Sequence, residues 1–200
     1  MKQAAILILV SFLYWACDSE NIAKPRPRQY PKINFPETNR ISFSTDTCPF
    51  SMEVPNYVDV VMKPQRDDDG QTHPCWFDID IPQLGAIIHC SYYAIDAVNS
   101  FEKLREDAYV MASKHNVKAS YRDEVAVETQ QGSKGLFFKI EGPVATPYQF
   151  YLSDEVDHFL RGSLYFKQKV DIDSVAPVID FLREDMNEMV GSIIWHDHKK

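Results

Sequence analysis

The sequence predicts an α+β sandwich, in which a mainly antiparallel sheet is covered by two main helices. Short segments that alternate apolar and polar residues are typical of half-buried strands, and they are followed by a helical segment. The same order, strands and then a helix, is repeated in the second half of the chain. The length of 200 residues fits one domain, and 44% hydrophobic with 25% charged residues is the composition of a globular protein.

The N-terminus has the pattern of an export signal over residues 1–16. One basic residue, Lys2, precedes an uncharged stretch from Ala4 to Ala16, and Cys17 follows directly. As a helix this stretch would span roughly 20 Å, which is too short for a hydrocarbon core of about 30 Å. The pattern favours a bacterial lipoprotein that carries its lipid on Cys17. An ordinary signal peptide followed by an incidental cysteine is the alternative.

Residues 17–40 are predicted to be a lipidated, extended tether, followed by a single globular α+β domain at residues 41–200. Spaced prolines interrupt the tether and favour extended backbone over a helix or a packed sheet. Its basic residues contrast with the acidic remainder of the chain. A solvated linker is the favoured interpretation, and contact with anionic lipid headgroups or an acidic partner is the alternative.

The first half of the domain is expected to contain strands and then a helix. The predicted strands are residues 51–55, 57–62, 76–81 and 85–93, with a loop at 63–74. Asn99 is expected to cap the helix, with Glu102 as its capping-box partner. The helix should bury a face that includes Leu104, Ala108 and Ala112.

The second half is expected to repeat this order. The predicted strands are residues 124–129, 135–141, 148–152 and 159–166. A hairpin turn from Gly132 to Gly135 should join the first two of them. The last helix is expected to begin at Asp173 or Ser174 and to hold Pro177 in its first turn.

Export permits disulfides, and three cysteines follow Cys17. Cys48 and Cys75 each head a short aromatic-rich run, whereas Cys90 lies within an apolar strand. We favour a disulfide between Cys48 and Cys75, with Cys90 as a buried thiol. This bridge would close a loop of about 28 residues and stabilise the fold by roughly 3–4 kcal/mol. A fully reduced chain or another pairing is the alternative.

Motifs for catalysis or cofactor binding are missing from the sequence. It holds no phosphate loop, dinucleotide fingerprint, zinc-protease helix or nucleophile elbow. A formal net charge of −8 and an isoelectric point of about 5.2 disfavour nucleic-acid binding. His196-Asp197-His198 is interpreted as a solvated tail rather than a metal site, and the acidic residues 67–69 as a turn. We therefore expect no cofactor and no metal.

His158 and Arg161 occupy opposite faces of the strand predicted at 159–166, because successive strand residues alternate. Arg161 stands among aromatic residues. Its favoured role is a structural ion pair with an acid such as Asp185, and the alternative is recognition at an interface.

Several sequence blocks occur in the same order as in a known family. They are the lipoprotein start, the Arg-Pro-Arg tether, Cys48-Pro49-Phe50-Ser51, Cys75-Trp76-Phe77-Asp78-Ile79, Ile88-His89 with Ser91-Tyr92, and the blocks at 158–166 and 176–185. In these blocks the chain resembles the GldD family of gliding-motility lipoproteins of the Bacteroidetes. The resemblance runs from the lipid-attachment cysteine to about Trp195.

The resemblance implies a non-enzymatic envelope lipoprotein that is required for gliding motility and supports assembly or stability of the gliding and type IX secretion machinery. Other gliding or secretion lipoproteins would be its partners. The family carries no established catalytic residues, and its fold is similar to the small α/β/α sandwiches of the PsbP and Mog1 type. We expect His158, Arg161, Glu184 and Asp185 to contribute to a partner interface.

The sequence leaves an alternative open for both the function and the location of the protein. A periplasmic ligand-binding module or hydrolase is the other function, and a deep pocket lined by His89, His158 and acids would favour it. The expected location is the periplasmic face of the outer membrane. The acidic residues after Cys17 resemble surface-export signals, whereas Asp18 directly after the cysteine resembles an inner-membrane retention signal.

Overall fold

Seven antiparallel strands form the main sheet, in the order β3-β6-β7-β11-β10-β9-β8. The computed structural model describes residues 33–66, 72–115, 117–167 and 172–196. The strands of this sheet are β3 (Asp59–Met62), β6 (Trp76–Ile81), β7 (Ala86–Ala94), β8 (Tyr121–Glu128), β9 (Lys134–Glu141), β10 (Tyr148–Ser153) and β11 (His158–Phe166).

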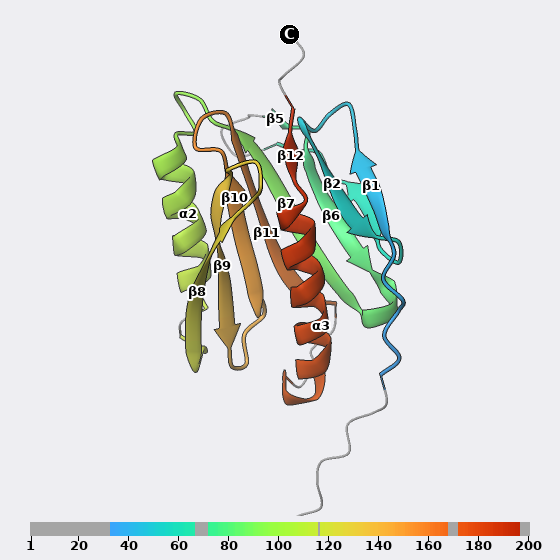
Figure 1. Cartoon of the computed structure of the whole chain (residues 1–200). Coiled ribbons are helices and arrows are strands. Elements are labelled where there is room, and N and C mark those ends of the chain that lie inside the picture. Colours follow the sequence, from blue (N-terminus) through green and yellow to red (C-terminus); the bar gives the residue numbers. More distant parts are fainter. Residues whose placement is uncertain (1–32, 67–71, 116, 168–171, 197–200) are drawn as a thin grey trace, which may run out of the picture. The chain divides into compact units, whose positions relative to one another are not determined.

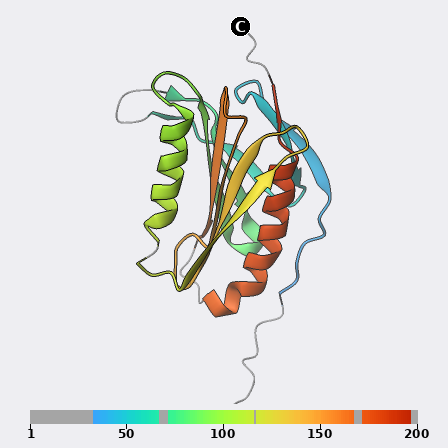
Figure 2. The same ribbon diagram turned by 60° about the vertical axis from the view of Figure 1, so that its left-hand side comes forward.

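A separate layer covers each face of the sheet (Figure 1). Helix α2 (Phe101–Ser113) packs against β10 and β11 on one side, the α2 face. Helix α3 (Ile172–Gly191) lies on the other side, the α3 face, beside a small sheet of the order β1-β2-β12. The turned view separates the two layers (Figure 2). The predicted α+β class, with a mainly antiparallel sheet and two main helices, is confirmed.

The remaining elements are short. The small sheet consists of β1 (Arg40–Ser44), β2 (Phe50–Pro55) and β12 (Ile194–Trp195), and a hairpin of β4 (Gln65–Arg66) and β5 (Thr72–His73) precedes β6. A 3-10 turn, η1 (Pro82–Leu84), joins β6 to β7. The sequence did not predict β1, whose first residue, Arg40, was assigned to the end of the tether.

Apolar side chains from both layers fill the space against the sheet. On the α3 face, Phe50 of β2, Phe77 of β6 and Met186 of α3 are at most 1% exposed. On the α2 face, Leu104 and Ala112 of α2 belong to a buried cluster with Phe138, Phe159 and other residues of the sheet. The alternation predicted for residues 76–81 is therefore real, since Phe77, Ile79 and Ile81 are buried and the residues between them are half-buried.

The cap of α2 differs from the prediction. Ser100, rather than Asn99, is the N-cap, and its hydroxyl accepts a hydrogen bond from the Lys103 N–H at 3.4 Å. Asn99 is held one residue earlier, because its N–H donates to Asp96 Oδ1 at 2.7 Å. Asn and Ser are both favourable N-cap residues. Because the turn at Asp96 holds Asn99 before the helix, Ser100 occupies the N-cap position.

Helix α3 begins at Ile172, before the predicted start at Asp173 or Ser174. Pro177 consequently lies inside the helix rather than in its first turn. The exposed and buried positions of the helix still follow the predicted stripe: Val178, Leu182, Met186, Met189 and Val190 are each at most 5% exposed.

A disulfide links Cys48 to Cys75 and so ties the small sheet to the main one. The two Cα atoms lie 5.1 Å apart, and the bridge joins the start of β2 to the start of β6. Cys90 of β7 is a buried free thiol, and burial raises its pKa. These are the states favoured for the three cysteines from the sequence.

Candidate functional site

A buried carboxylate on the inner side of α3 holds the start of the domain against the helix. Arg40 Nη2 donates to Asp185 Oδ1 at 2.7 Å, and the Tyr57 hydroxyl donates to Asp185 Oδ2. The Asp185 side chain is 8% exposed, so its charge is shielded from water and needs these partners. Arg40 begins β1 and Tyr57 follows β2, so one carboxylate joins three segments.

Burial raises the pKa of the Asp185 carboxyl, whereas the Tyr57 hydrogen bond and the Arg40 charge oppose this rise. Burial also raises the pKa of Tyr57, and its hydrogen bond to Asp185 adds to the effect. The phenol therefore remains a neutral donor at physiological pH. This arrangement is suited to holding segments together rather than to moving protons.

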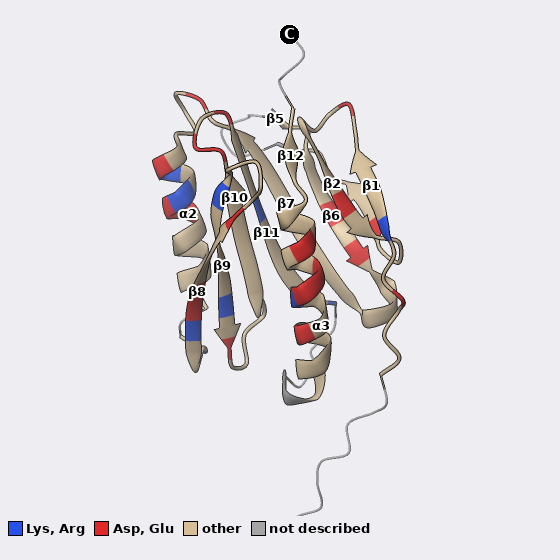
Figure 3. Ribbon diagram, viewed as in Figure 1, with Lys and Arg blue, Asp and Glu red and all other residues tan. Residues whose placement is uncertain are grey.

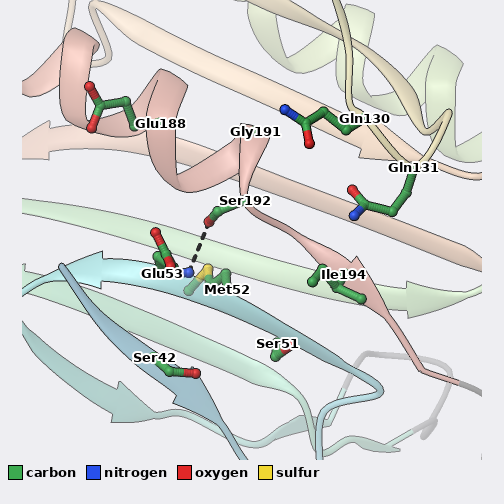
Figure 4. Close-up of a pocket in the computed structure, with 10 residues that line it drawn as sticks. All are labelled: Ser42, Ser51, Met52, Glu53, Gln130, Gln131, Glu188, Gly191, Ser192 and Ile194. Carbon is green, nitrogen blue, oxygen red and sulfur yellow. Dashed lines mark hydrogen bonds between the residues drawn. The ribbon is translucent and has the colours of Figure 1, made fainter.

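Arg40 also pairs with Glu188, which lies one turn further along α3 and is 68% exposed. Glu188 stands at the border of an open groove of about 530 Å³ (Figure 4). The groove is lined by Ser42, Ser51, Met52, Glu53, Gln130, Gln131, Glu188, Gly191, Ser192 and Ile194. We call this depression the terminal groove, because β12 and the end of α3 form one side of it.

Local hydrogen bonds fix the walls of the terminal groove. The Ser192 hydroxyl accepts from the Glu53 N–H at 2.8 Å and donates to the Met189 carbonyl at 2.7 Å. The serine thus joins the end of α3 to β2, as the dashed line in Figure 4 shows for its contact with Glu53. Gln130 and Gln131 come from the β8–β9 turn, where Gly132 adopts a φ of 83°.

The terminal groove is acidic. Glu53 and Glu188 are the charged residues among those that line it. Nearer the start of α3, Asp180 and Glu184 are exposed at intervals of four residues from Glu188, and such spacing places all three on one side of a helix. We call Asp180, Glu184 and Glu188 the acidic ridge; Figure 3 shows the acidic colouring of α3. The carbonyl end of the helix adds partial negative charge beside the groove.

The groups that line this region are able to bind a ligand. Its carboxylates, amides and hydroxyls can accept hydrogen bonds from a cationic or amide-rich ligand. Among the residues that line the terminal groove, serines are the only nucleophiles and no histidine is present. Across the described residues, no group of three or more metal-ligating side chains is found.

The expected interface residue His158 is buried rather than surface-exposed. It is 5% exposed, and its Nδ1 lies 2.8 Å from the Tyr92 hydroxyl. The ring of Trp195 stacks on the imidazole with centroids 5.0 Å apart, and its Nε1 donates to Ser133 Oγ at 2.8 Å. His158 therefore holds β12 against the main sheet.

Arg161 does not form the ion pair with Asp185 favoured from the sequence. It lies on the α2 face, where its guanidinium stands 5.5 Å from the Tyr93 ring centroid and 2.8 Å from Met111 Sδ. Asp185 lies on α3, across the sheet, and pairs with Arg40. Strand alternation shows that Arg161 and His158 lie on opposite faces of the strand, but it does not show which helix covers each face. The ion-pair partner of Arg161 was therefore predicted wrongly.

Glu184 and Asp185 are neighbours with opposite environments. Glu184 is exposed on the acidic ridge, whereas Asp185 is turned inward to Arg40 and Tyr57. The structure therefore brings the two acids to one helix but leaves His158 and Arg161 elsewhere, and the four expected residues form no single surface. Arg40, Tyr57 and Glu53 were not identified from the sequence. The sequence holds one indication of a strand at Arg40, which is the alternation of apolar and polar residues that begins after it with Ile41 and Phe43.

Other sequence candidates lie at separate places. His89 Nδ1 lies 2.6 Å from Asp78 Oδ1 on the α2 face of the sheet, away from His158. His196 Nε2 contacts Ser51 Oγ at 2.9 Å near the terminal groove. Asp197, His198, the acidic residues 67–69, Cys17 and the signal segment are outside the described residues. In the part of the chain that is described, no helix is long and apolar enough to cross a membrane.

Comparison with known proteins identifies the family. A solved structure of cyanobacterial PsbP from Synechocystis sp. PCC 6803 is similar, with 10% identity, a TM-score of 0.44, and coverage of 80% of this chain and 95% of that one. No curated protein sequence matches this chain. The family described as gliding motility lipoprotein GldD matches residues 20–195, nearly the whole length. The chain is therefore a member of the GldD family of gliding motility lipoproteins.

Proposed function

We propose that this protein supports the assembly or stability of the gliding and type IX secretion machinery by binding other envelope lipoproteins, without catalysing a reaction. It acts from the periplasmic face of the outer membrane, held there by acyl chains such as palmitate on Cys17. Membership in a gliding motility lipoprotein family supports the anchor and the process.

The acidic terminal groove and the adjoining acidic ridge carry the proposal of a binding role. A solvent-open groove with hydrogen-bond acceptors suits a polypeptide segment. Carboxylates at Glu53 and Glu184 favour a partner segment that carries lysine or arginine, whereas Glu188 is already paired with Arg40. Arg161 and His158 act through the fold in this proposal, and Glu184 is the expected residue that contacts a partner directly.

The test is recovery of partners from mildly solubilised envelopes with a tagged full-length chain, followed by mass spectrometry. We expect gliding or secretion lipoproteins to accompany the parent protein and to be lost with Cys17→Ala. A Glu53→Lys/Glu184→Lys variant should keep its anchor but recover about tenfold less partner, because two attractive contacts become repulsive.

Glu106→Lys on the exposed side of α2 is the matched control, since it reverses the same kind of charge on the other layer. Spreading on agar should follow partner recovery in every variant. Normal spreading and normal recovery with Glu53→Lys/Glu184→Lys would refute the groove and ridge as the binding surface. A parent protein that is recovered alone would refute the assembly role itself.

A further inference from the structure

One of the two edges of the main sheet is the long strand β8. It has eight residues and pairs only with β9 among the described residues. Edge strands are commonly protected by proline, by charged side chains, by a bulge or by a covering element. β8 contains neither proline nor lysine and exposes Tyr121 (54%) and Val125 (48%), although half of its residues are charged. It is the outermost strand of the sheet in Figure 1.

The backbone groups that face outward from this edge can be assigned from the β8–β9 hairpin. The Thr129 N–H donates to the Ser133 carbonyl at 2.9 Å, one position beyond the Glu128↔Lys134 pair. Hydrogen-bonded and non-bonded pairs alternate along an antiparallel ladder. Val127, Val125 and Asp123 therefore bond to β9. Arg122, Glu124, Ala126 and Glu128 direct their N–H and C=O groups to the free edge.

We propose that β8 pairs with β8 of a second copy of this chain, antiparallel and around a two-fold axis at Val125. Each outward-facing residue then exchanges two backbone hydrogen bonds with its counterpart. Ala126 faces Glu124 of the second copy, and Arg122 faces Glu128 of the second copy. The main sheets of the two copies become one continuous sheet with a self-complementary interface.

Charge complementarity favours this occupant, and it favours this register over those centred on Asp123, Glu124 or Ala126. With the axis at Val125, no like charges face each other across the strands. Arg122, which bonds Glu124 and Ser113 within its own chain, faces Glu128 of the second copy twice by symmetry. An axis at Asp123 would place that residue opposite itself. An axis at Glu124 would do the same, and an axis at Ala126 would place Glu124 opposite Glu128. The favoured register also brings the two exposed Val125 side chains into contact.

Cysteine cross-linking tests the register with the full-length protein in mild detergent. The two Val125 residues form a non-bonded pair whose Cα atoms are about 4.5 Å apart, within the range that a disulfide spans. Val125→Cys should give a covalent dimer after oxidation with copper phenanthroline, and reductant should reverse it. Val156→Cys is the matched control, because Val156 is 67% exposed in the β10–β11 turn and should stay monomeric.

A second test changes the charge of residues on β8 and measures the mass of the monomer and the dimer, without a cross-link. Val125→Lys places two ammonium groups at the axis and should weaken the dimer about tenfold or more, whereas Val156→Lys should leave it unchanged. Glu128→Arg should weaken it as well, because the new arginine would face Arg122 of the second copy. The mass of each species is read by light scattering.

The outcomes separate this proposal from the groove proposal. A monomeric parent protein together with an uncross-linked Val125→Cys would overturn the pairing of two copies. Cross-linking of Val125→Cys to a different protein would overturn it too, since the edge would then accept a foreign strand. Partner recovery through Glu53 and Glu184 is independent of either result, because those residues lie on β2 and α3.

Discussion

At the scale of single residues, Asp185 shows how hydrogen-bond and ion-pair partners offset the energetic cost of burying a charge. Its carboxylate is shielded by α3 and satisfied by a guanidinium and a phenol from two other segments. Removing one partner from such a group leaves the rest of the cost of burial uncompensated. The stability of the domain therefore depends on a few named contacts more than on the number of its ion pairs, most of which are exposed.

Tyr57→Phe should lower the free energy of unfolding by about 1–3 kcal/mol, because the buried Asp185 carboxylate loses a hydrogen-bond donor. Urea denaturation followed by circular dichroism measures the change. Tyr121→Phe removes the same hydroxyl from a 54% exposed position and should alter stability by less than about 0.5 kcal/mol. Equal losses in the two variants would contradict the assigned role.

His115 links stability to pH. Burial lowers the pKa of this imidazole below 6.5, and its Nε2 lies 2.7 Å from Oγ1 of the buried Thr146. The folded state therefore binds the proton less tightly than the unfolded chain does. The stabilising contribution is complete above pH 6.5 and is lost as the pH falls through the lowered folded pKa.

His115→Gln should flatten the pH dependence of unfolding just below pH 6.5, since the variant has no proton to gain there. One group limits the difference in slope to about 1.4 kcal/mol per pH unit. Urea titrations of parent and variant at a series of pH values provide the comparison, and the other histidines cancel in it. Parallel curves would show that His115 titrates alike in both states.

At the scale of elements, two glycines let strands and rings approach closely. A Cβ atom at Gly135 would lie 1.9 Å from the carbonyl oxygen of Tyr151, which belongs to the neighbouring strand β10. A Cβ atom at Gly162 would meet the Phe150 ring at 2.3 Å. The two sites differ, because a ring can turn aside whereas the backbone of a central strand cannot.

Gly135→Ala should destabilise the domain by more than about 3 kcal/mol, since β9 must shift away from β10 to admit the methyl group. Gly191→Ala is the matched control at the end of α3, where nothing lies within 4 Å of the added carbon. It should be neutral or stabilise by up to about 1 kcal/mol. Thermal unfolding of both variants gives the comparison, and similar midpoints would contradict the close approach.

Most elements could be predicted from the sequence, because the burial of one face gives a strand or helix a regular spacing of apolar residues. Residues 76–81 alternate cleanly, and α3 carries its apolar stripe. β1 was missed because Arg40 extends the basic segment before it, and the partner of Arg40 lies 145 residues away. The terminal groove could not be predicted, since it forms only where β2, the β8–β9 turn and the end of α3 meet. Glu184 was selected from a family block, and Asp185 beside it proved structural.

At the scale of the whole molecule, the two layers differ in what they leave accessible. The α2 layer covers β10 and β11 and leaves His89 of β7 exposed on the same face, where it pairs with Asp78 of β6. The α3 layer is larger and is tied to the main sheet by the Cys48–Cys75 disulfide. It presents the acidic ridge and the terminal groove. We therefore assign partner binding to the α3 layer and self-association to the opposite end of the strand order, at β8.

The small sheet also joins the two ends of the described chain, because β12 pairs with β2 beside β1. Ile193 is fully buried just before β12, and Trp195 closes over His158. Along the described chain β12 follows every other strand and both helices, so β2 gains its last neighbour only after all of them are present. A polypeptide that lacks β12 cannot finish this sheet. Such a product would also leave His158 without the stacked ring of Trp195 and would stay open to proteolysis.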